Sequence, residues 1–258
     1  MNELRYVYAV TRPFDGPLAE DLRGVAATQP YALHHGDLVA VVSAVSADEF
    51  DESPLRANLE DLDWLTETAR AHEAVVAALS SLTCPLPLRL ATVCRDEDGV
   101  RRMLDSGHDR FLDTLKRLDG RVEWGVKVYA ETPEAQEPAP APAREPASAT
   151  TGRDYLRRRL QERRAAEGTW ERADAVSRRL HEELSRHAEA DRLHRPQQAQ
   201  LSKAAGHNVL NAAYLVPREE SAAFVASLDE LRPHEPGIRV ELTGPWAPYS
   251  FTGEVGER

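Results

Sequence analysis

The chain has 258 residues, which at about 100–200 residues per domain corresponds to one large domain or two ordinary ones. Hydrophobic residues make up 41% of it, enough to build cores, so an intrinsically disordered chain is excluded. Acidic residues outnumber basic ones by 43 to 32, a net charge of -11. This argues against a general nucleic-acid binder, because contacts with phosphates require an excess of cations.

The opening residues 1–10 lack the basic stretch and apolar core of a signal peptide. No stretch approaches the about 18 apolar residues of a membrane-spanning helix, so we expect a cytoplasmic protein without membrane contact. The two cysteines, Cys84 and Cys94, match no zinc or redox spacing. We expect both to be reduced, partly buried thiols.

The first half of the chain predicts a strand, a short helix, a hairpin, a long helix, another strand and a second long helix. Their ranges are 4–10, 18–25, 31–34 with 37–42, 55–82, 86–93 and 96–118. The first long helix is predicted because apolar residues recur in steps of three and four, a stripe that should face the core. This stripe consists of Leu55, Leu59, Leu62, Leu65, Ala69, Val76 and Leu79.

The second half predicts strand, helix, short edge strand, strand, helix and strand. Their ranges are 122–130, 154–190, 191–194, 209–216, a helix that begins at Pro217, and 238–242. This order is typical of a ferredoxin-like sandwich. We therefore predict an α+β protein of two domains. Residues 1–119 form an α+β domain with a mixed sheet and long helices, and residues 120–258 form a ferredoxin-like domain. A proline- and alanine-rich variable loop, residues 132–152, lies within the second domain.

Motifs for catalysis are missing from the sequence. There is no Gly-rich phosphate loop, G-x-S-x-G, H-E-x-x-H or C-x-x-C. His72 falls at the next step of the apolar stripe, and no pair of histidines has the spacing of metal ligands. A buried, hydrogen-bonded structural histidine is a better interpretation than a ligand or a general base. We predict no catalytic residue, no cofactor and no metal.

Acidic residues are concentrated around the start of the first long helix. Nine of them lie between residues 48 and 73, against only Arg56 and Arg70: Asp48, Glu49, Asp51, Glu52, Glu60, Asp61, Asp63, Glu67 and Glu73. The surface is either a solvated face or a docking surface for a basic partner. Trp64 lies off the apolar stripe, which favours Glu60, Asp61, Trp64 and Glu67 as partner-binding residues. In the competing interpretation, Trp64 packs under the strands of its own domain.

An arginine run opens the long helix of the second half. It consists of Arg153, Arg157, Arg158, Arg159, Arg163 and Arg164. One interpretation is a solvated helix with i, i+4 ion pairs. The other is contact with an acidic partner or with the acidic helix of the first domain. A nucleic-acid site is a poor fit, because no aromatic stacking residues are interleaved.

The C-terminal segment places Trp246, Tyr249 and Phe251 close together between prolines. Three aromatic residues this close are either buried or bind something. The tail folds back onto the sheet between domains, or it presents a contact surface for a hydrophobic partner, and the two interpretations are compatible.

Seven collinear segments resemble the gas vesicle GvpF/GvpL protein family. They are Tyr6–Tyr8, Asn58–Leu65, Arg70–Glu73, Pro87–Val93, Val122–Tyr129, Asn211–Val216 and Leu242–Phe251. The family often has glycine where this chain has Ala91, and phenylalanine near Cys94. The motifs are shared by the F and L members, so they do not separate the two.

The resemblance implies a cytoplasmic, gas vesicle-associated accessory protein that is not an enzyme. It implies binding of the small, very hydrophobic shell protein GvpA, protection of GvpA from aggregation during assembly, and contact with other gas vesicle accessory proteins. It also implies a two-domain α+β fold whose second domain is a modified ferredoxin-like one. The net charge of -11 fits a soluble escort for an insoluble protein. The alternative is a ferredoxin-like small-molecule-binding protein or enzyme, since that fold often houses a ligand against its sheet.

Overall fold

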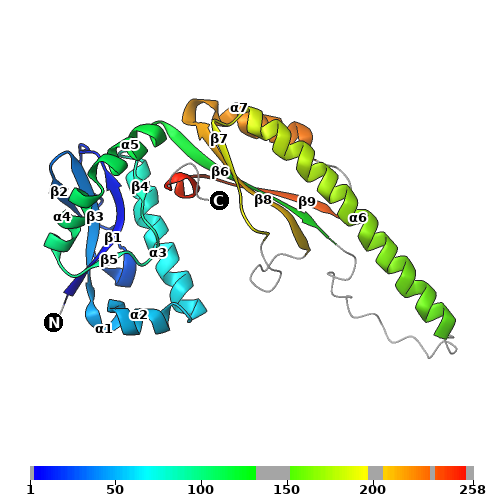
Figure 1. The fold of residues 1–258 in the computed structure, drawn as a ribbon, viewed down its shortest axis with the longest axis horizontal. Helices are drawn as coiled ribbons and strands as arrows, with labels where there is room; N and C mark the ends of the chain where they lie inside the picture. Colours follow the sequence, from blue (N-terminus) through cyan, green and yellow to red (C-terminus); the bar gives the residue numbers. More distant parts are fainter. Residues whose placement is uncertain (1–2, 132–151, 197–205, 233–235, 254–258) are drawn as a thin grey trace. The chain divides into compact units, whose positions relative to one another are not determined.

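The computed structural model describes residues 3–131, 152–196, 206–232 and 236–253 (Figure 1). The chain divides into two compact units: Met1–Glu123 with Pro245–Arg258, and Trp124–Gly244. The C-terminal segment, which the sequence assigns to the second domain, is thus grouped with the first unit. The expected loop 132–152 lies outside the described residues, apart from Gly152 at the start of a helix.

The first unit contains five strands, five α-helices and two 3₁₀ turns among its described residues. In chain order these are β1 (Glu3–Thr11), η1 (Val25–Ala27), β2 (Tyr31–His35), β3 (Leu38–Ser46), α1 (Ala47–Phe50), α2 (Glu52–Asn58), α3 (Leu62–Ser80), β4 (Leu86–Pro87), β5 (Val93–Cys94), α4 (Glu97–Ser106), α5 (His108–Leu118) and η4 (Tyr249–Phe251). The expected hairpin is confirmed, with Gly36 at φ +60° in the turn between β2 and β3.

The strand order of this sheet is β2-β3-β1-β4, with β5 also paired to β1. Every pairing is antiparallel, so the predicted mixed sheet is wrong. The reason is the position of β1. α3 carries the chain from β3 to β4, and these two strands run in the same direction. Because β1 lies between them, the crossover creates no parallel pair.

Helices pack against both faces of this sheet. Residues 6–11 of β1 are all buried, although successive side chains of a strand point to opposite faces. α3 and α4 both contact β1. One core cluster joins Tyr6 and Tyr8 of β1 to Val75, Val76 and Leu79 of α3.

Both predicted long helices of the first unit are interrupted. The helix over 55–82 is divided into α2 and α3, because the Asp61 carboxylate accepts hydrogen bonds from the backbone N–H groups of Asp63 and Trp64 and so begins a new helix. The helix over 96–118 breaks at Gly107, where an added Cβ would lie 2.7 Å from the Phe111 ring. The expected helix over 18–25 is wrong, since that region contains only the short turn η1.

The predicted strand over 86–93 is reduced to the short strands β4 and β5. Between them, Ala91 has φ +61°, a left-handed conformation that an extended strand cannot contain. Glycine would adopt this backbone conformation without the strain that the Ala91 Cβ atom brings.

The second unit contains β6 (Arg121–Ala130), α6 (Gly152–Arg186), β7 (Ala190–Leu193), β8 (His207–Pro217), η3 (Arg218–Glu220), α7 (Ser221–Leu231) and β9 (Ile238–Trp246). This matches the element order expected from the sequence. The strand order is β7-β8-β6-β9, with β7 and β8 antiparallel. α6 and α7 both contact β8, and the core beneath them includes Tyr214 and Phe224.

Candidate functional site

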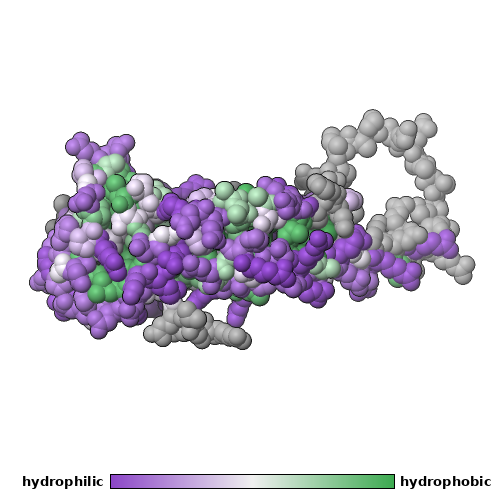
Figure 2. Space-filling view, turned by 90° about the horizontal axis from the view of Figure 1, so that it is seen from above, coloured by the Kyte–Doolittle hydropathy of each residue, from purple (hydrophilic) through white to green (hydrophobic). Residues whose placement is uncertain are grey.

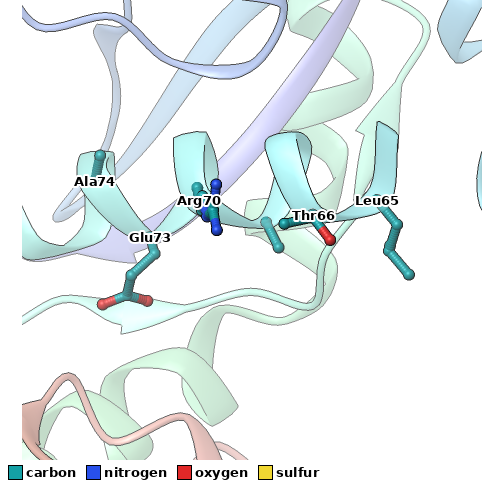
Figure 3. Close-up of a pocket in the computed structure, with 6 residues that line it drawn as sticks. Leu65, Thr66, Arg70, Glu73 and Ala74 are labelled. Carbon is teal, nitrogen blue, oxygen red and sulfur yellow. The ribbon is translucent and has the colours of Figure 1, made fainter. Parts of the chain in front are cut away.

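Helix α3 has one buried face and one open face. Thr68, His72, Val75, Val76 and Leu79 are buried against the sheet. On another side of the helix lies a shallow, wide-open pocket of about 580 Å³, whose lining residues all belong to α3 and whose lining surface is mostly apolar (Figure 3). We call it the α3 groove; it is lined by Leu65, Thr66, Ala69, Arg70, Glu73 and Ala74.

The predicted apolar stripe is only half correct. Val76 and Leu79 are fully buried, but Leu59 is 39% exposed and Leu62 is 65% exposed. Ala69 and Leu65 lie in the groove wall instead of in the core. The buried stripe follows Thr68, His72 and Val75, so the N-terminal half of α3 turns part of its apolar surface outward.

Two opposite charges line the groove without forming an ion pair. Arg70 and Glu73 are three positions apart on α3, and neither forms an ion pair within the part of the chain that the structure describes. Glu73 is half-buried, and this burial raises its pKa; the Tyr249 hydroxyl partly offsets the effect. A cation placed opposite Glu73 would be strongly favoured there, since opposite charge stabilises the ionised carboxylate.

The C-terminal tail is held against the first unit by specific contacts. The Glu123 carboxylate accepts hydrogen bonds from the Ser250 backbone N–H at 2.7 Å and the Ser250 hydroxyl at 2.6 Å. The Arg117 guanidinium donates to the carbonyl oxygens of Phe251 and Gly253. The tail therefore packs on the first unit of its own chain, through residues of α5 and β6, and the expected position on the sheet between domains stays a prediction.

The three tail aromatics differ in exposure. Phe251 is 2% exposed and Tyr249 is half-buried, whereas Trp246 is 43% exposed. Tyr249 packs beside His72, with ring centroids 6.2 Å apart. Of the three predicted binding residues, Trp246 has the surface to contact a partner directly, and the other two hold the tail in place.

His72 is a buried structural residue. The Tyr6 hydroxyl accepts a hydrogen bond from the Ala91 backbone N–H, which leaves its own proton to donate to Nδ1 of His72 at 2.9 Å. Burial lowers the pKa of His72 to about 4, so the imidazole is neutral at physiological pH. Its Nε2 atom has no hydrogen-bond partner among the described residues. The ring is enclosed by Tyr6, Tyr8 and Tyr249.

The predicted acidic residues lie at the start of α3. Glu60, Asp61 and Glu67 are exposed, and Asp61 caps the helix. Trp64 is half-buried, with its ring 5.6 Å from the Phe50 ring in a tilted arrangement. The competing interpretation of Trp64 as a residue packed in its own domain therefore accounts for most of its surface.

The arginine run lies on the first part of α6. Arg157, Arg163 and Arg164 are exposed, and Arg163 lies 3.8 Å from Glu167 in an i, i+4 ion pair. The side chains of Arg153, Arg158 and Arg159 lie outside the described residues. The described pair fits the interpretation as a solvated helix face.

Among the described residues, Cys84 and Cys94 form no disulfide and both are partly buried, as expected. No group of three or more His, Cys, Asp or Glu side chains in the described ranges is arranged to hold a metal ion. Among the helices that the structure describes, none is long and apolar enough to cross a membrane.

The fold is shared with two solved structures. The crystal structure of the gas vesicle protein GvpF from Anabaena sp. PCC7120 superposes with a TM-score of 0.67 at 17% identity, covering 99% of this chain and 98% of the other. The GvpF crystal structure from Microcystis aeruginosa superposes with a TM-score of 0.65 at 16% identity, covering 98% and 100%. The class of protein is thus an α+β protein with two sheets and a GvpF-like fold.

Sequence comparison identifies the family. The family model "Gas vesicle synthesis protein GvpL/GvpF" matches residues 4–253. Gas vesicle protein L of a Streptomyces species (strain CB03234) is 64% identical over 99% of this chain and 95% of its own length. Gas vesicle protein F of the same strain is 28% identical over 95% and 98%. The chain belongs to the GvpL/GvpF family of gas vesicle proteins.

The α3 groove was not predicted from the sequence. The apolar spacing placed Leu62, Leu65 and Ala69 on the same stripe as Val76 and Leu79, which was predicted to face the core. The spacing does not tell whether such a stripe is covered by the rest of the protein. A usable signal was the small size of Ala69, Ala74 and Thr66 on one side of the helix, since small side chains allow another helix to approach closely.

Proposed function

We propose that this protein is a non-enzymatic accessory protein of gas vesicle formation that binds the shell protein GvpA and limits its aggregation during nucleation and assembly. The observation that carries the proposal is the family match, which spans residues 4–253 and so covers both units. We place the protein in the cytoplasm, in association with the vesicle. The difference between 64% and 28% identity favours the L-type member over the F-type one.

The physical basis is protection of an apolar surface. A shell protein with exposed apolar strands aggregates through strand edges and hydrophobic patches. An escort must cover this surface and keep the pair dispersed. A net charge of -11 supplies the repulsion between complexes. One face of the molecule is largely hydrophilic, with hydrophobic residues in separate patches (Figure 2), which suits such an escort.

We assign shell-protein binding to the first domain, residues 1–119, and the C-terminal tail. The binding residues that we propose are Glu60, Asp61, Trp64, Glu67, Trp246, Tyr249 and Phe251. Exposure separates their roles: the acidic residues and Trp246 contact the partner, whereas Tyr249 and Phe251 hold the tail. We further infer that the second domain, which the sequence places at residues 120–258, is ferredoxin-like over the second unit, Trp124–Gly244; the strand order β7-β8-β6-β9 supports this.

Co-expression with the shell protein tests the proposal. A tagged copy of this chain and untagged GvpA are expressed together, and the tagged protein is recovered from the soluble fraction. We expect GvpA to co-purify and its soluble fraction to rise relative to expression without the escort. A soluble escort that recovers no GvpA at any ionic strength contradicts the proposal.

A matched control separates binding from general solubilisation. The second unit offers an exposed surface on α7, where Ala222 and Ala223 face solvent. A charge-reversed variant at the acidic surface, Glu60→Arg with Glu67→Arg, should recover less GvpA than wild type. Ala223→Arg should recover as much. Equal recovery by all three forms would remove the acidic surface from the proposal.

A further inference from the structure

We infer that the α3 groove is a helix-binding site that receives an amphipathic helix of the shell protein, with a basic residue of that helix placed against Glu73. This inference deepens the proposed function and rests on it. It adds an apolar contact on a side of α3 that differs from the flank of Trp64 and Glu67, where the proposed function places the acidic contact.

The groove has the surface of a helix–helix contact. Its lining is mostly apolar and includes the small side chains Thr66, Ala69 and Ala74. Small residues let two helix axes approach to about 8–10 Å. Leu62 lies one turn before Thr66 and is 65% exposed, and Leu59 is 39% exposed. An amphipathic helix that lies along α3 would remove these leucines from water, the usual driving force for helix-in-groove binding.

The charges of the groove determine which charged residues the bound helix, here called the guest helix, must carry. Arg70 and Glu73 both line the groove and form no ion pair within the described chain. A guest that covered them without partners would leave two buried charges uncompensated, which is strongly unfavourable. The guest helix therefore carries a basic residue opposite Glu73 and an acidic or hydrogen-bonding residue opposite Arg70.

The acidic residues around the groove favour a guest helix that carries basic residues beside its apolar face. Nine acidic residues lie between positions 48 and 73, against two arginines. Arg56 is already paired with Glu52 at 3.5 Å, which leaves Arg70 to face the acids. Complementary charge steers association and selects the orientation of the partner.

The tail limits the groove at the C-terminal part of α3. The Tyr249 hydroxyl lies near the Glu73 carboxylate. The hydroxyl lowers the pKa of Glu73, and the carboxylate raises the pKa of Tyr249. Because the tail is held by Glu123 and Arg117, Tyr249 is fixed in place beside Glu73. The guest helix is thus expected to extend from Glu73 toward Leu62 and the acidic residues beyond it.

Two variants test the groove directly against GvpA. Ala69→Arg fills the floor of the groove with a bulky charged side chain, and Leu62→Ser removes an exposed apolar contact without touching the core. The control is Ala223→Arg, the same exchange on the exposed face of α7. Thermal unfolding of each variant confirms that it is folded before binding is measured.

We expect Ala69→Arg to weaken GvpA binding at least tenfold and Leu62→Ser about threefold, with the control within twofold of wild type. A photo-crosslinker at Thr66 should label GvpA, and one at Ala223 should not. Should wild type bind GvpA while Ala69→Arg and Leu62→Ser bind equally well, the groove is not the site, although the proposed function stands. If wild type itself does not bind GvpA, the proposed function fails first.

A second copy of this chain is the competing occupant of the groove. Sedimentation of the purified protein distinguishes it, because self-association through the groove would be concentration-dependent and lost in Ala69→Arg. That result, together with unchanged binding of GvpA, would overturn the inference. Monomeric wild type with groove-dependent GvpA binding supports it.

Discussion

The two sides of helix α3 differ in what their apolar residues do. On the buried side, Val75, Val76 and Leu79 are fully enclosed with Tyr6 and Tyr8 of β1. On the groove side, the leucines nearest the start of the helix remain in contact with solvent. One helix therefore supplies both the core of the first unit and an unoccupied surface. The comparison shows that an apolar stripe on a helix does not by itself identify a core.

The largest expected effect is on the buried side. Leu79→Ala should lower the free energy of unfolding by about 3 kcal/mol, because it leaves a cavity in a packed core. Leu62→Ala on the exposed side should change it by less than about 0.5 kcal/mol. Urea unfolding measures both. Comparable losses of unfolding free energy in the two variants would show that Leu62 is buried as fully as Leu79, which contradicts the comparison.

His72 gives the buried side a pH dependence. Its pKa falls from 6.5 to about 4 on folding, so the unfolded chain binds the proton more strongly. The stability contributed by neutral His72 is present above pH 6.5 and is lost as the pH falls toward 4, by up to about 3 kcal/mol. The measurement is urea unfolding of wild type and His72→Phe at several pH values between 4 and 7.

The His72→Phe variant should lose this part of the pH dependence. At pH 7 it should be less stable by about 1 kcal/mol, because Tyr6 loses its acceptor. Carboxylates titrate in both proteins, so the difference between the two pH profiles isolates the imidazole. Parallel profiles would show that His72 is not held neutral by burial.

The C-terminal tail packs beside His72 on the buried side of α3, and its position depends on Glu123. Glu123→Ala should cost about 2 kcal/mol, because it removes the charged acceptor of two hydrogen bonds from Ser250. Amide hydrogen exchange should accelerate at Ser250. The exposed Glu20→Ala provides the control for loss of a negative charge. Unchanged exchange at Ser250 would mean that Glu123 does not anchor the tail.

The smallest expected effect concerns the backbone beside Tyr6. Ala91 has φ +61°, which is unfavourable for a residue with a Cβ atom. Ala91→Gly should stabilise the protein by about 0.5 kcal/mol, since relief of this strain exceeds the added entropy of the unfolded chain. A small rise in the urea midpoint with an unchanged slope is the expected result. A fall in the midpoint would show that Ala91 is not strained.

Elements with a strong local pattern could be predicted from the sequence. The β2–β3 hairpin follows from the turn at Gly36, and the order of elements in the second unit follows from strand and helix periodicity. The breaks at Asp61 and Gly107 were missed, although each has a local signal. Asp61 is a good N-cap, and Gly107 is a helix-weakening residue, but continuous apolar spacing outweighed both signals.

The direction of the sheet pairs and the exposure of α3 could not be predicted. Whether a crossover helix creates a parallel pair depends on which strand lies between its ends, and that position for β1 is set by tertiary packing. Likewise, periodicity describes where Leu62 and Ala69 lie on α3 but not what covers them. Of the candidate binding residues, Trp64 and the three tail aromatics are those whose burial the sequence left open. The structure buries Phe251, half-buries Trp64 and Tyr249, and leaves Trp246 43% exposed.

Aggregation of GvpA in the presence of the purified protein tests the central claim most directly. Denatured GvpA is diluted into buffer with an equimolar amount of wild type or of Ala69→Arg, and light scattering is followed. The account predicts suppressed scattering and a soluble complex with wild type, and markedly less suppression with Ala69→Arg. Scattering by GvpA that is unaffected by wild type would contradict the account.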